Sequence, residues 1–87
     1  MTDAEFRSLT AGDKVSAAGS DIRYDAIVRG AYGDYGDLVG VRIAIVWCEK
    51  SPNADSVWNS YRAGATVTEQ NRSSFQKGWH QDGSRRG

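Results

Sequence analysis

Apolar and polar residues alternate along two central stretches of the chain, and this alternation predicts two half-buried β-strands. In residues 22–29 the predicted inward positions are Ile22, Tyr24, Ala26 and Val28, and the outward ones are Arg23, Asp25, Ile27 and Arg29. In residues 39–47 the predicted inward positions are Val39, Val41, Ile43, Ile45 and Trp47. We therefore expect one common core, with the charged positions of the first strand in water. The outward positions of the second strand include Ala44, Val46 and Cys48, so its second half should be covered on both faces.

Weaker patterns predict three further strands. Residues 14–18 indicate a first strand, and residues 57–62 and 65–70 indicate a closing pair joined by a tight turn at Ala63-Gly64. The glycines and aspartates between residues 30 and 38 predict a loop rather than a continued strand. The core expected from all these strands is Val15, Tyr24, Ala26, Val28, Val41, Ile43, Ile45, Trp47 and Val67.

The first residues predict a short helix. Thr2-Asp3-Ala4-Glu5 matches a capping box, in which the Thr and Glu side chains each accept a backbone N–H. Phe6 and Leu9 are three residues apart, so both can point to one side and cover an end of the sheet. No segment sustains a helical period over about ten residues, which argues against a helical bundle. The pattern therefore predicts an all-β domain of five strands with one helical cap.

Three motifs follow one another along the chain. Leu9-Thr-Ala-Gly12-Asp13-Lys-Val15 enters the first strand, Val41-Arg-Ile-Ala-Ile-Val-Trp47 forms a long third strand ending in Trp, and Tyr61-Arg-Ala-Gly64-Ala-Thr-Val67 holds the closing turn. This order resembles that of the SH3-like small β-barrels, the Tudor and KOW group in particular, over roughly residues 9–70. The resemblance implies a five-stranded SH3-like barrel with a short N-terminal helical turn and a C-terminal tail. It also implies a non-enzymatic module that binds protein, peptide or nucleic acid.

Length and composition limit the class of protein. The chain has 87 residues, enough for one domain, and its 11 basic and 11 acidic residues balance, which argues against a protein dominated by phosphate contacts. No apolar run approaches the roughly 18 residues of a membrane-spanning helix, and the first residues lack the regions of a signal peptide. A single cysteine, Cys48, excludes an internal disulfide framework and a multi-cysteine zinc site. We therefore expect a cytoplasmic protein without a membrane partner.

Charge divides the chain into two parts. Residues 1–71 carry seven basic and ten acidic side chains, and residues 72–87 carry four basic and one acidic, so we expect a barrel followed by a basic tail, disordered from about residue 82. The tail residues expected to make contacts are Arg72, Phe75, Lys77 and Trp79. In one interpretation a helical turn starting at Ser73 or Ser74 packs both aromatic rings against the outward apolar positions. In the others the tail contacts a partner protein, or stacks on bases and neutralises phosphates.

The repeat Tyr32-Gly33-Asp34-Tyr35-Gly36-Asp37 is the first candidate for a recognition site. Tyrosine gives contact area at little entropic loss, while glycine and aspartate adapt to a partner. With two aromatic residues further along the chain, the predicted partner-binding set is Tyr32, Asp34, Tyr35, Asp37, Trp58 and Tyr61. We expect the rings of Tyr32 and Tyr35 to be exposed, and those of Tyr24 and Trp47 to be buried.

Other chemistry has less support in the sequence. Asp34 and Asp37 are oxygen donors of the kind calcium prefers, but two carboxylates fall short of its six to eight ligands, so turn geometry is the simpler interpretation. An aromatic cage for a methylated cation would need the four rings of the predicted set around one pocket. His80 and Cys48 have no neighbour in sequence that would complete a nucleophile–base pair. We therefore predict no catalytic residue, no metal and no cofactor.

The leading hypothesis is a non-enzymatic small binding module, a bacterial or phage accessory protein that acts by protein–protein interaction. The source is indicated by arginine outnumbering lysine eight to three, which favours a GC-rich genome. The alternative is a nucleic-acid-associated domain of KOW or Tudor type that uses the basic tail, with weak and salt-sensitive binding. A homodimer through the face of Val46 and Cys48 is a further prediction, because a bare apolar stripe on a sheet favours association.

Overall fold

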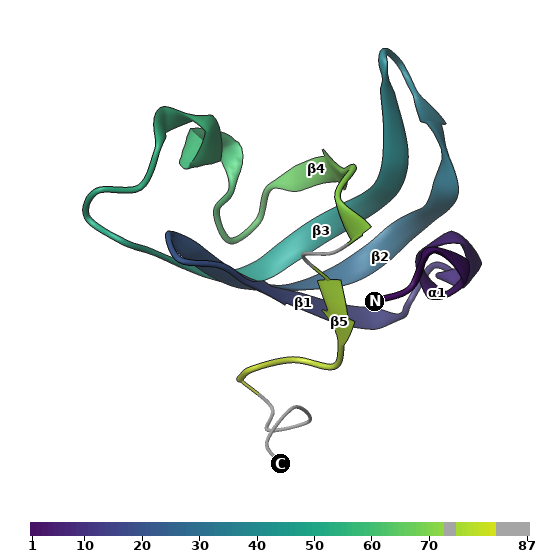
Figure 1. The fold of residues 1–87 in the computed structure, drawn as a ribbon, viewed down its shortest axis with the longest axis horizontal. Coiled ribbons are helices and arrows are strands. Elements are labelled where there is room, and N and C mark those ends of the chain that lie inside the picture. The colour runs from purple at the N-terminus through teal and green to yellow at the C-terminus, as the bar shows by residue number, and fades with distance from the viewer. Residues whose placement is uncertain (73–74, 82–87) are drawn as a thin grey trace.

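Five antiparallel strands form one sheet in the order β4-β3-β2-β1-β5 (Figure 1). The computed structural model describes residues 1–72 and 75–81. Within these ranges the elements are α1 Asp3–Ser8, β1 Lys14–Ala18, β2 Ile22–Tyr35, β3 Leu38–Lys50, the 3-10 helix η1 Ser56–Ser60, β4 Thr66–Glu69 and β5 Phe75–Lys77. The all-β prediction is confirmed, and the sheet is open, with β4 and β5 at its edges. No helix in the described part of the chain is long and apolar enough to span a bilayer.

The predicted helical cap is confirmed. Thr2 Oγ1 accepts the Glu5 backbone N–H at 3.1 Å, and Glu5 Oε1 accepts the Thr2 N–H at 3.0 Å, which completes the capping box at the start of α1. Phe6 and Leu9 are both buried, as their spacing predicts. α1 therefore covers one end of the core, beside the long β2 strand (Figure 1).

The core lies on one face of the sheet, which we call the inner face. Its buried apolar side chains are Phe6, Leu9, Val15, Ala17, Ile22, Tyr24, Ala26, Val28, Val41, Ile43, Ile45 and Phe75. Alternation along β1, the first half of β2 and the middle of β3 is thus confirmed. Val39, predicted to face inward, is 45% exposed, because it lies near the hairpin tip and the pairing of β3 with β4 begins only at Val41.

Trp47 is not part of the core, because the register of β2 and β3 shifts beside it. Asp25 pairs with Trp47, while its neighbour Ala26 pairs two residues earlier on β3, so Val46 is an additional residue, a β-bulge. Beyond the bulge the alternation of β3 is inverted. Trp47 therefore lies on the opposite, outer face, and Cys48 packs against the core. Val46 and Cys48 do not form the shared face on which the homodimer prediction rests.

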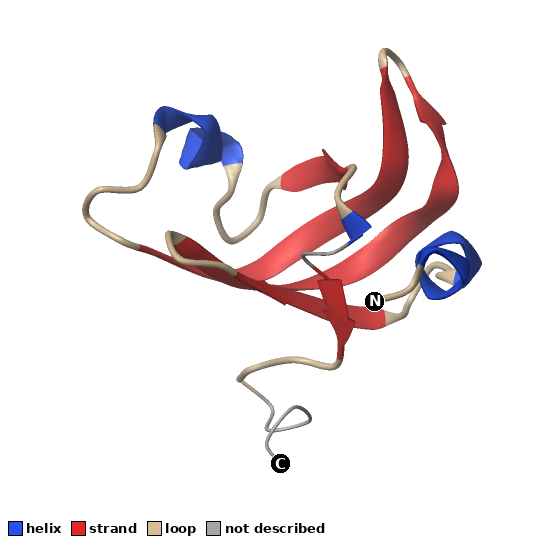
Figure 2. Ribbon diagram, in the orientation of Figure 1, coloured by secondary structure: helices blue, strands red, loops and turns tan. Residues whose placement is uncertain are grey.

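β2 and β3 continue as a long hairpin where a loop is predicted, so that prediction is wrong. The ladder passes through residues 30–38 and closes with Tyr35 opposite Leu38, and Gly36 adopts φ 69° in the two-residue turn. The hairpin also needs glycine at position 30, because a Cβ atom there would clash with the Tyr35 hydroxyl. Figure 2 shows the two strands running almost to the tip. The repeat of Tyr, Gly and Asp thus supplies strand and turn positions instead of a free loop.

The fifth strand comes from the segment that the sequence assigns to a tail. β5 pairs antiparallel with β1, and Phe75 within it is fully buried in the core. Gly78 follows with φ 89°, so the helical turn predicted for this segment is wrong from Phe75 onward. Its predicted start at residues 73–74, and the predicted disorder of residues 82–87, lie outside the described residues. Because β5 belongs to the same sheet as the other four strands, a domain boundary after residue 71 would separate one strand from the rest of the sheet.

Residues 57–62 do not form the predicted strand. Most of them belong to η1, whose start is capped by Asp55, because its Oδ1 accepts the Val57 N–H at 3.1 Å. The predicted turn at Ala63-Gly64 is present, with Gly64 at φ 90°. It leads from η1 into β4 rather than joining two strands of a hairpin.

The last described residues cross the outer face and close over Asp25. This carboxylate is 0% exposed and accepts the backbone N–H groups of His80 and Gln81, at 2.8 and 3.0 Å. The Trp79 indole donates to the Ala26 carbonyl at 2.8 Å. The prediction that Asp25 faces water is therefore wrong, because the C-terminal segment covers it. The last described residues thus pack on the domain, but the prediction that both aromatic rings cover the outward positions is wrong for Phe75, which lies in the core on the inner face.

Candidate functional site

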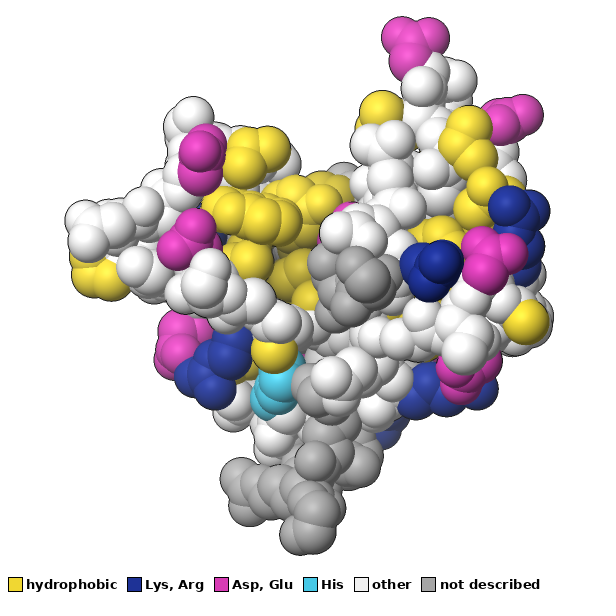
Figure 3. All heavy atoms as spheres, in the orientation of Figure 1, with side chains coloured by type: hydrophobic (Ala, Val, Ile, Leu, Met, Phe, Trp, Pro, Cys, Tyr) yellow, Lys and Arg dark blue, Asp and Glu magenta, His cyan; other side chains and the backbone are white. Residues whose placement is uncertain are grey.

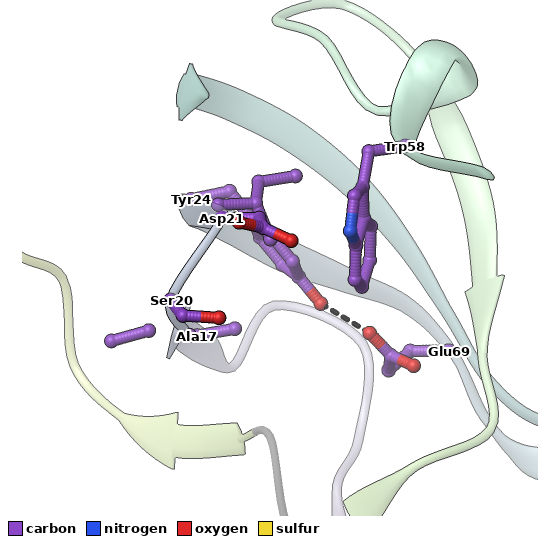
Figure 4. Close-up of a pocket in the computed structure, with 9 residues that line it drawn as sticks. Ala17, Ser20, Asp21, Tyr24, Trp58 and Glu69 are labelled. Carbon is purple, nitrogen blue, oxygen red and sulfur yellow. Dashed lines mark hydrogen bonds between the residues drawn. The ribbon is translucent and has the colours of Figure 1, made fainter. Parts of the chain in front are cut away.

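A pocket of about 160 Å³ opens beside the turn that joins β1 to β2. Its lining residues are Ala17, Ala18, Gly19, Ser20, Asp21, Ile22, Tyr24, Trp58 and Glu69. They come from the end of β1 with the turn after it, the start of β2, η1 and the end of β4 (Figure 4). Figure 3 shows hydrophobic side chains gathered in a hollow between η1 and the sheet, with acidic side chains beside it.

Tyr24 and Glu69 form the deep part of this pocket. Both occupy inner-face positions, Tyr24 on β2 and Glu69 at the end of β4, and they are 1% and 7% exposed. The Tyr24 hydroxyl donates to Glu69 Oε1 at 2.6 Å (Figure 4). The Asn71 N–H donates to Glu69 Oε2 at 3.2 Å. Burial raises the pKa of the Tyr24 phenol strongly, and the Glu69 carboxylate raises it further. The phenol therefore stays protonated and remains a hydrogen-bond donor.

Trp58 forms an aromatic wall of the pocket. Two hydrogen bonds tie its segment to β3: Lys50 Nζ donates to the Trp58 carbonyl at 3.2 Å, and Cys48 Sγ donates to the Tyr61 carbonyl at 3.4 Å. The Trp58 and Tyr61 rings meet edge to face with 5.0 Å between centroids, and the Tyr61 ring lies 5.6 Å from that of Tyr24. Burial raises the pKa of Tyr61 to about 12. Three contacting rings thus fix the aromatic side of the site.

The pocket is suited to a cationic group. Among the described residues, its lining contains two acidic residues, Asp21 and Glu69, and no lysine, arginine or histidine. The faces of tryptophan and tyrosine rings attract a cation within about 6 Å, and a nearly buried carboxylate attracts an opposite charge strongly. At about 160 Å³ the pocket is smaller than the roughly 300–1,000 Å³ that holds a whole small-molecule ligand. It fits one side chain or head group.

Only part of the predicted partner-binding set comes together. Trp58 and Tyr61 lie together at the pocket. Tyr32 lies at the other end of the core, where its ring packs edge-on against Phe6 at 5.7 Å and the Arg7 guanidinium sits 4.4 Å from its centroid. The ring contacts that connect these two ends of the core run through Trp58, Tyr61, Tyr24, Phe75, Phe6 and Tyr32. The four predicted rings therefore do not surround one cage.

The rest of the Tyr-Gly-Asp repeat lies near the hairpin tip. Tyr35 is half-buried and donates its hydroxyl to the Ala31 carbonyl at 2.6 Å. Asp34 and Asp37 are exposed. The expectation that the Tyr32 and Tyr35 rings are exposed is wrong, because both residues are half-buried: Tyr32 packs against Phe6, and Tyr35 is hydrogen-bonded to the Ala31 carbonyl. Among the described residues, no three His, Cys, Asp or Glu side chains are grouped so that they could hold a metal ion.

The predicted tail contacts are used within the fold. Arg72 Nε lies 3.8 Å from Asp3 Oδ1, and Phe75 is part of the core. Lys77 is in β5, and Trp79 lies on the outer face. The aromatic rings of this segment therefore stabilise the domain instead of extending from it.

His80 and Cys48 lie on opposite faces of the sheet. On the outer face, His80 Nε2 is 3.1 Å from the Ala17 carbonyl, and the ring lies edge-on to Trp47 at 5.9 Å. On the inner face, burial raises the pKa of the Cys48 thiol, which favours the unreactive protonated form. The two side chains are separated by the sheet and do not form a nucleophile–base pair.

The sequence-based prediction of the site does not include three residues of the pocket, Asp21, Tyr24 and Glu69. Tyr24 is predicted only as a core residue, and nothing in the sequence marks Asp21. Glu69 carries a usable signal, because alternation from Val67 places it on the inward face of its strand. An acidic residue at an apolar position points to a buried charge and hence to a candidate site.

No family model, no curated protein and no solved structure matches this chain. Function is therefore inferred from the pocket and the surfaces of the described residues.

Proposed function

We propose that this protein is a non-enzymatic binding module that acts by protein–protein interaction, and that its partner inserts a positively charged side chain between Trp58 and Glu69. The observation that carries the proposal is the nearly buried Glu69 carboxylate, which borders an aromatic pocket whose described lining includes no cationic side chain. The carboxylate accepts hydrogen bonds from the Tyr24 hydroxyl and the Asn71 N–H, but none of the described lining residues supplies an opposite charge. A cation supplied by a ligand would compensate this charge.

The surroundings of the pocket favour a macromolecular partner over a free metabolite. The pocket has room for one side chain, so the rest of the ligand must lie outside it. Val57, the neighbour of Trp58, is 65% exposed and offers an apolar contact beside the opening. An aromatic anchor in a pocket with apolar contacts around it is the usual arrangement of an interaction hot spot.

The proposal on fold class is an SH3-like small barrel. Two features support it: the first four strands follow one another as neighbours in the sheet, and β5 returns to the free edge of β1. α1 covers one end of the core, as the helical cap of such a barrel would. A cytoplasmic location and a bacterial or phage source belong to the same proposal, and the free thiol of Cys48 fits a reducing compartment.

A nucleic-acid-associated domain of KOW or Tudor type, using the basic tail, is the second candidate. Phe75 is buried and Trp79 is hydrogen-bonded to β2, so the two rings that would stack on bases are engaged within the fold. Nucleic-acid binding therefore needs basic groups elsewhere on the molecule.

The test is an NMR titration with two tripeptides blocked at both ends, acetyl-Gly-Lys-Gly-amide and its neutral counterpart with norleucine in place of lysine. The lysine peptide should shift the Trp58 indole N–H signal, and the norleucine peptide should not. Glu69→Gln keeps an oxygen acceptor for the Tyr24 hydroxyl but removes the charge, and we expect it to weaken lysine binding about 10- to 100-fold, the usual strength of a charged hydrogen bond.

The matched control is Asp34→Asn, which removes one negative charge from the exposed hairpin tip. It should leave the affinity for the lysine peptide unchanged within about twofold. Equal shifts with the norleucine peptide, or equal losses in the two variants, would show that the pocket does not recognise a cation.

A further inference from the structure

A second pocket, of about 330 Å³, lies at the other end of the core, beside α1, and we call it the α1 pocket. It shares no described lining residue with the pocket at Trp58. Its volume reaches the roughly 300–1,000 Å³ that holds a whole small-molecule ligand. The described lining residues are Asp3 and Phe6 of α1, Tyr32 of β2, and Gln70, Asn71 and Arg72, which follow β4.

The charged groups at the α1 pocket leave one positive charge in excess. Two guanidinium groups share the single Asp3 carboxylate: Arg7 Nε lies 2.8 Å from Oδ2, and Arg72 Nε lies 3.8 Å from Oδ1. In Figure 3 basic and acidic side chains adjoin in the region of α1. The longer distance exceeds that of a hydrogen bond, and the Arg72 side chain is 50% exposed. The N–H groups of Arg72 are therefore open to an anion.

Aromatic and polar groups complete the α1 pocket. Phe6 is buried and gives the pocket an apolar base. The Tyr32 ring is held in place, because it packs edge-on against Phe6 and the Arg7 guanidinium lies 4.4 Å from its centroid. Within the described part of the chain, the Tyr32 hydroxyl and the Gln70 side-chain amide have no hydrogen-bond partner. Both are thus available to a ligand that rests on the rings.

We propose that the α1 pocket binds a small aromatic carboxylic acid, with its carboxylate on Arg72 and its ring beside Phe6 and Tyr32. The guanidinium group presents parallel N–H donors that match the two oxygens of a carboxylate. Aromatic rings attract one another at centroid distances of about 4.5–7 Å, and the contact of Tyr32 with Phe6 already has this geometry. This site goes beyond the proposed partner interaction and does not depend on it, because the two pockets have separate linings.

The test is an NMR titration of the full chain with 3-phenylpropionate near neutral pH. We expect the Tyr32 backbone amide and the Gln70 side-chain amide signals to shift, with a Kd of about 1 mM, a typical affinity for so small a ligand. Two further compounds separate the ring from the charge. 3-Phenylpropionamide keeps the ring without the charge, and propionate keeps the charge without the ring. Each should bind about tenfold more weakly than 3-phenylpropionate.

Arg72→Gln removes the positive charge that the proposal assigns to the ligand. We expect it to weaken 3-phenylpropionate binding about tenfold, and to leave folding intact because its ion pair with Asp3 is exposed. The matched control is Arg62→Gln, the same change at an exposed position between η1 and β4. It should keep the affinity within about twofold, and so should Glu69→Gln. The result is therefore separate from cation binding at Trp58.

Three outcomes would overturn the proposal, and one of them needs no variant. In the unsubstituted protein, absence of saturable shifts up to about 20 mM 3-phenylpropionate, or shifts confined to the Trp58 indole, would exclude this site for the acid. Equal affinity for the amide or for propionate would show that charge and ring are not recognised together. Equal losses in Arg72→Gln and Arg62→Gln would show that Arg72 does not hold the carboxylate.

Discussion

Among the residues that the structure describes, two acidic side chains are buried, and they lie on opposite faces of the sheet. Asp25, on the outer face, is enclosed by the last described residues, and both of its oxygens accept backbone N–H groups. Glu69, on the inner face, accepts hydrogen bonds from the Tyr24 hydroxyl and the Asn71 N–H, and it borders the pocket. The two carboxylates have similar burial but different surroundings.

This difference separates a structural charge from a candidate binding charge. The chain itself satisfies Asp25, which is fully buried and lines none of the three described pockets. Glu69 has open space and an aromatic wall next to it. Burial of a charge is therefore not enough to identify a site, and the space beside the charge decides its role.

Deleting residues 72–87 is the strongest test of how much the last described residues, which cover Asp25 on the outer face, contribute to stability. The deletion removes β5 with Phe75, and it leaves the Asp25 carboxylate without its two N–H donors. Loss of a buried Phe side chain alone costs about 3–5 kcal/mol, which is comparable with the roughly 5–15 kcal/mol stability of a whole domain. We expect a chain ending at Asn71 to lose its cooperative thermal transition or to elute from size exclusion as an associated species.

The control for this truncation is a chain that ends at Gln81, which keeps every tail contact described above. Its melting temperature and elution volume should equal those of the full chain. A stable monomer ending at Asn71 would show that β5 and the closure over Asp25 contribute little to the fold.

Single substitutions at the two carboxylates should affect stability unequally. Asp25→Ala leaves the His80 and Gln81 N–H groups without an acceptor, and we expect a loss of about 2–4 kcal/mol in the free energy of unfolding. Glu69→Gln keeps an acceptor for Tyr24, and we expect a loss of about 1 kcal/mol or less. Urea unfolding of both variants measures the difference. If Glu69→Gln proved the more damaging, Glu69 would be the structural charge.

The pH dependence of the tyrosines gives the smallest and most local test. Burial raises the pKa of Tyr24 above its ordinary value and raises that of Tyr61 to about 12. At pH 11 the absorbance at 295 nm should show that at least two of the four tyrosines are still protonated, whereas the denatured chain ionises near pH 10. Full ionisation of the folded protein at pH 11 would contradict the buried Tyr24–Glu69 pair.

The direction of the two tyrosine pKa shifts determines whether the folded state gains or loses stability as the pH rises. The folded pKa values lie above those of the unfolded chain, so folding favours the protonated phenols. Their contribution to stability is complete below about pH 10 and is lost as the pH rises toward the folded values. Tyr24→Phe should reduce this alkaline loss.

The sequence alone determined those secondary-structure elements whose characteristic residues lie within a few positions of one another. The alternation in residues 14–18 and 22–28 and the capping box at Thr2 describe β1, the first half of β2 and α1 correctly. Trp58 and Tyr61 could be chosen as site residues because exposed aromatic side chains favour recognition, although the strand predicted for their segment is wrong. These conclusions hold because side-chain direction in a strand or a helix turn depends on sequence spacing alone.

Only the tertiary structure decided the features that join distant segments. The bulge beside Asp25 moves Trp47 to the outer face, and a one-residue shift of this kind inverts every later side chain without a local signal in the sequence. Phe75 joins the core because β1 offers a free edge, and the Asp25 carboxylate is satisfied by amides 55 and 56 residues away. The pocket likewise exists only where three separate segments meet: residues 17–24, η1 and the end of β4. Such contacts depend on how the whole chain packs, because their free energy comes from burial and pairing between residues far apart in sequence.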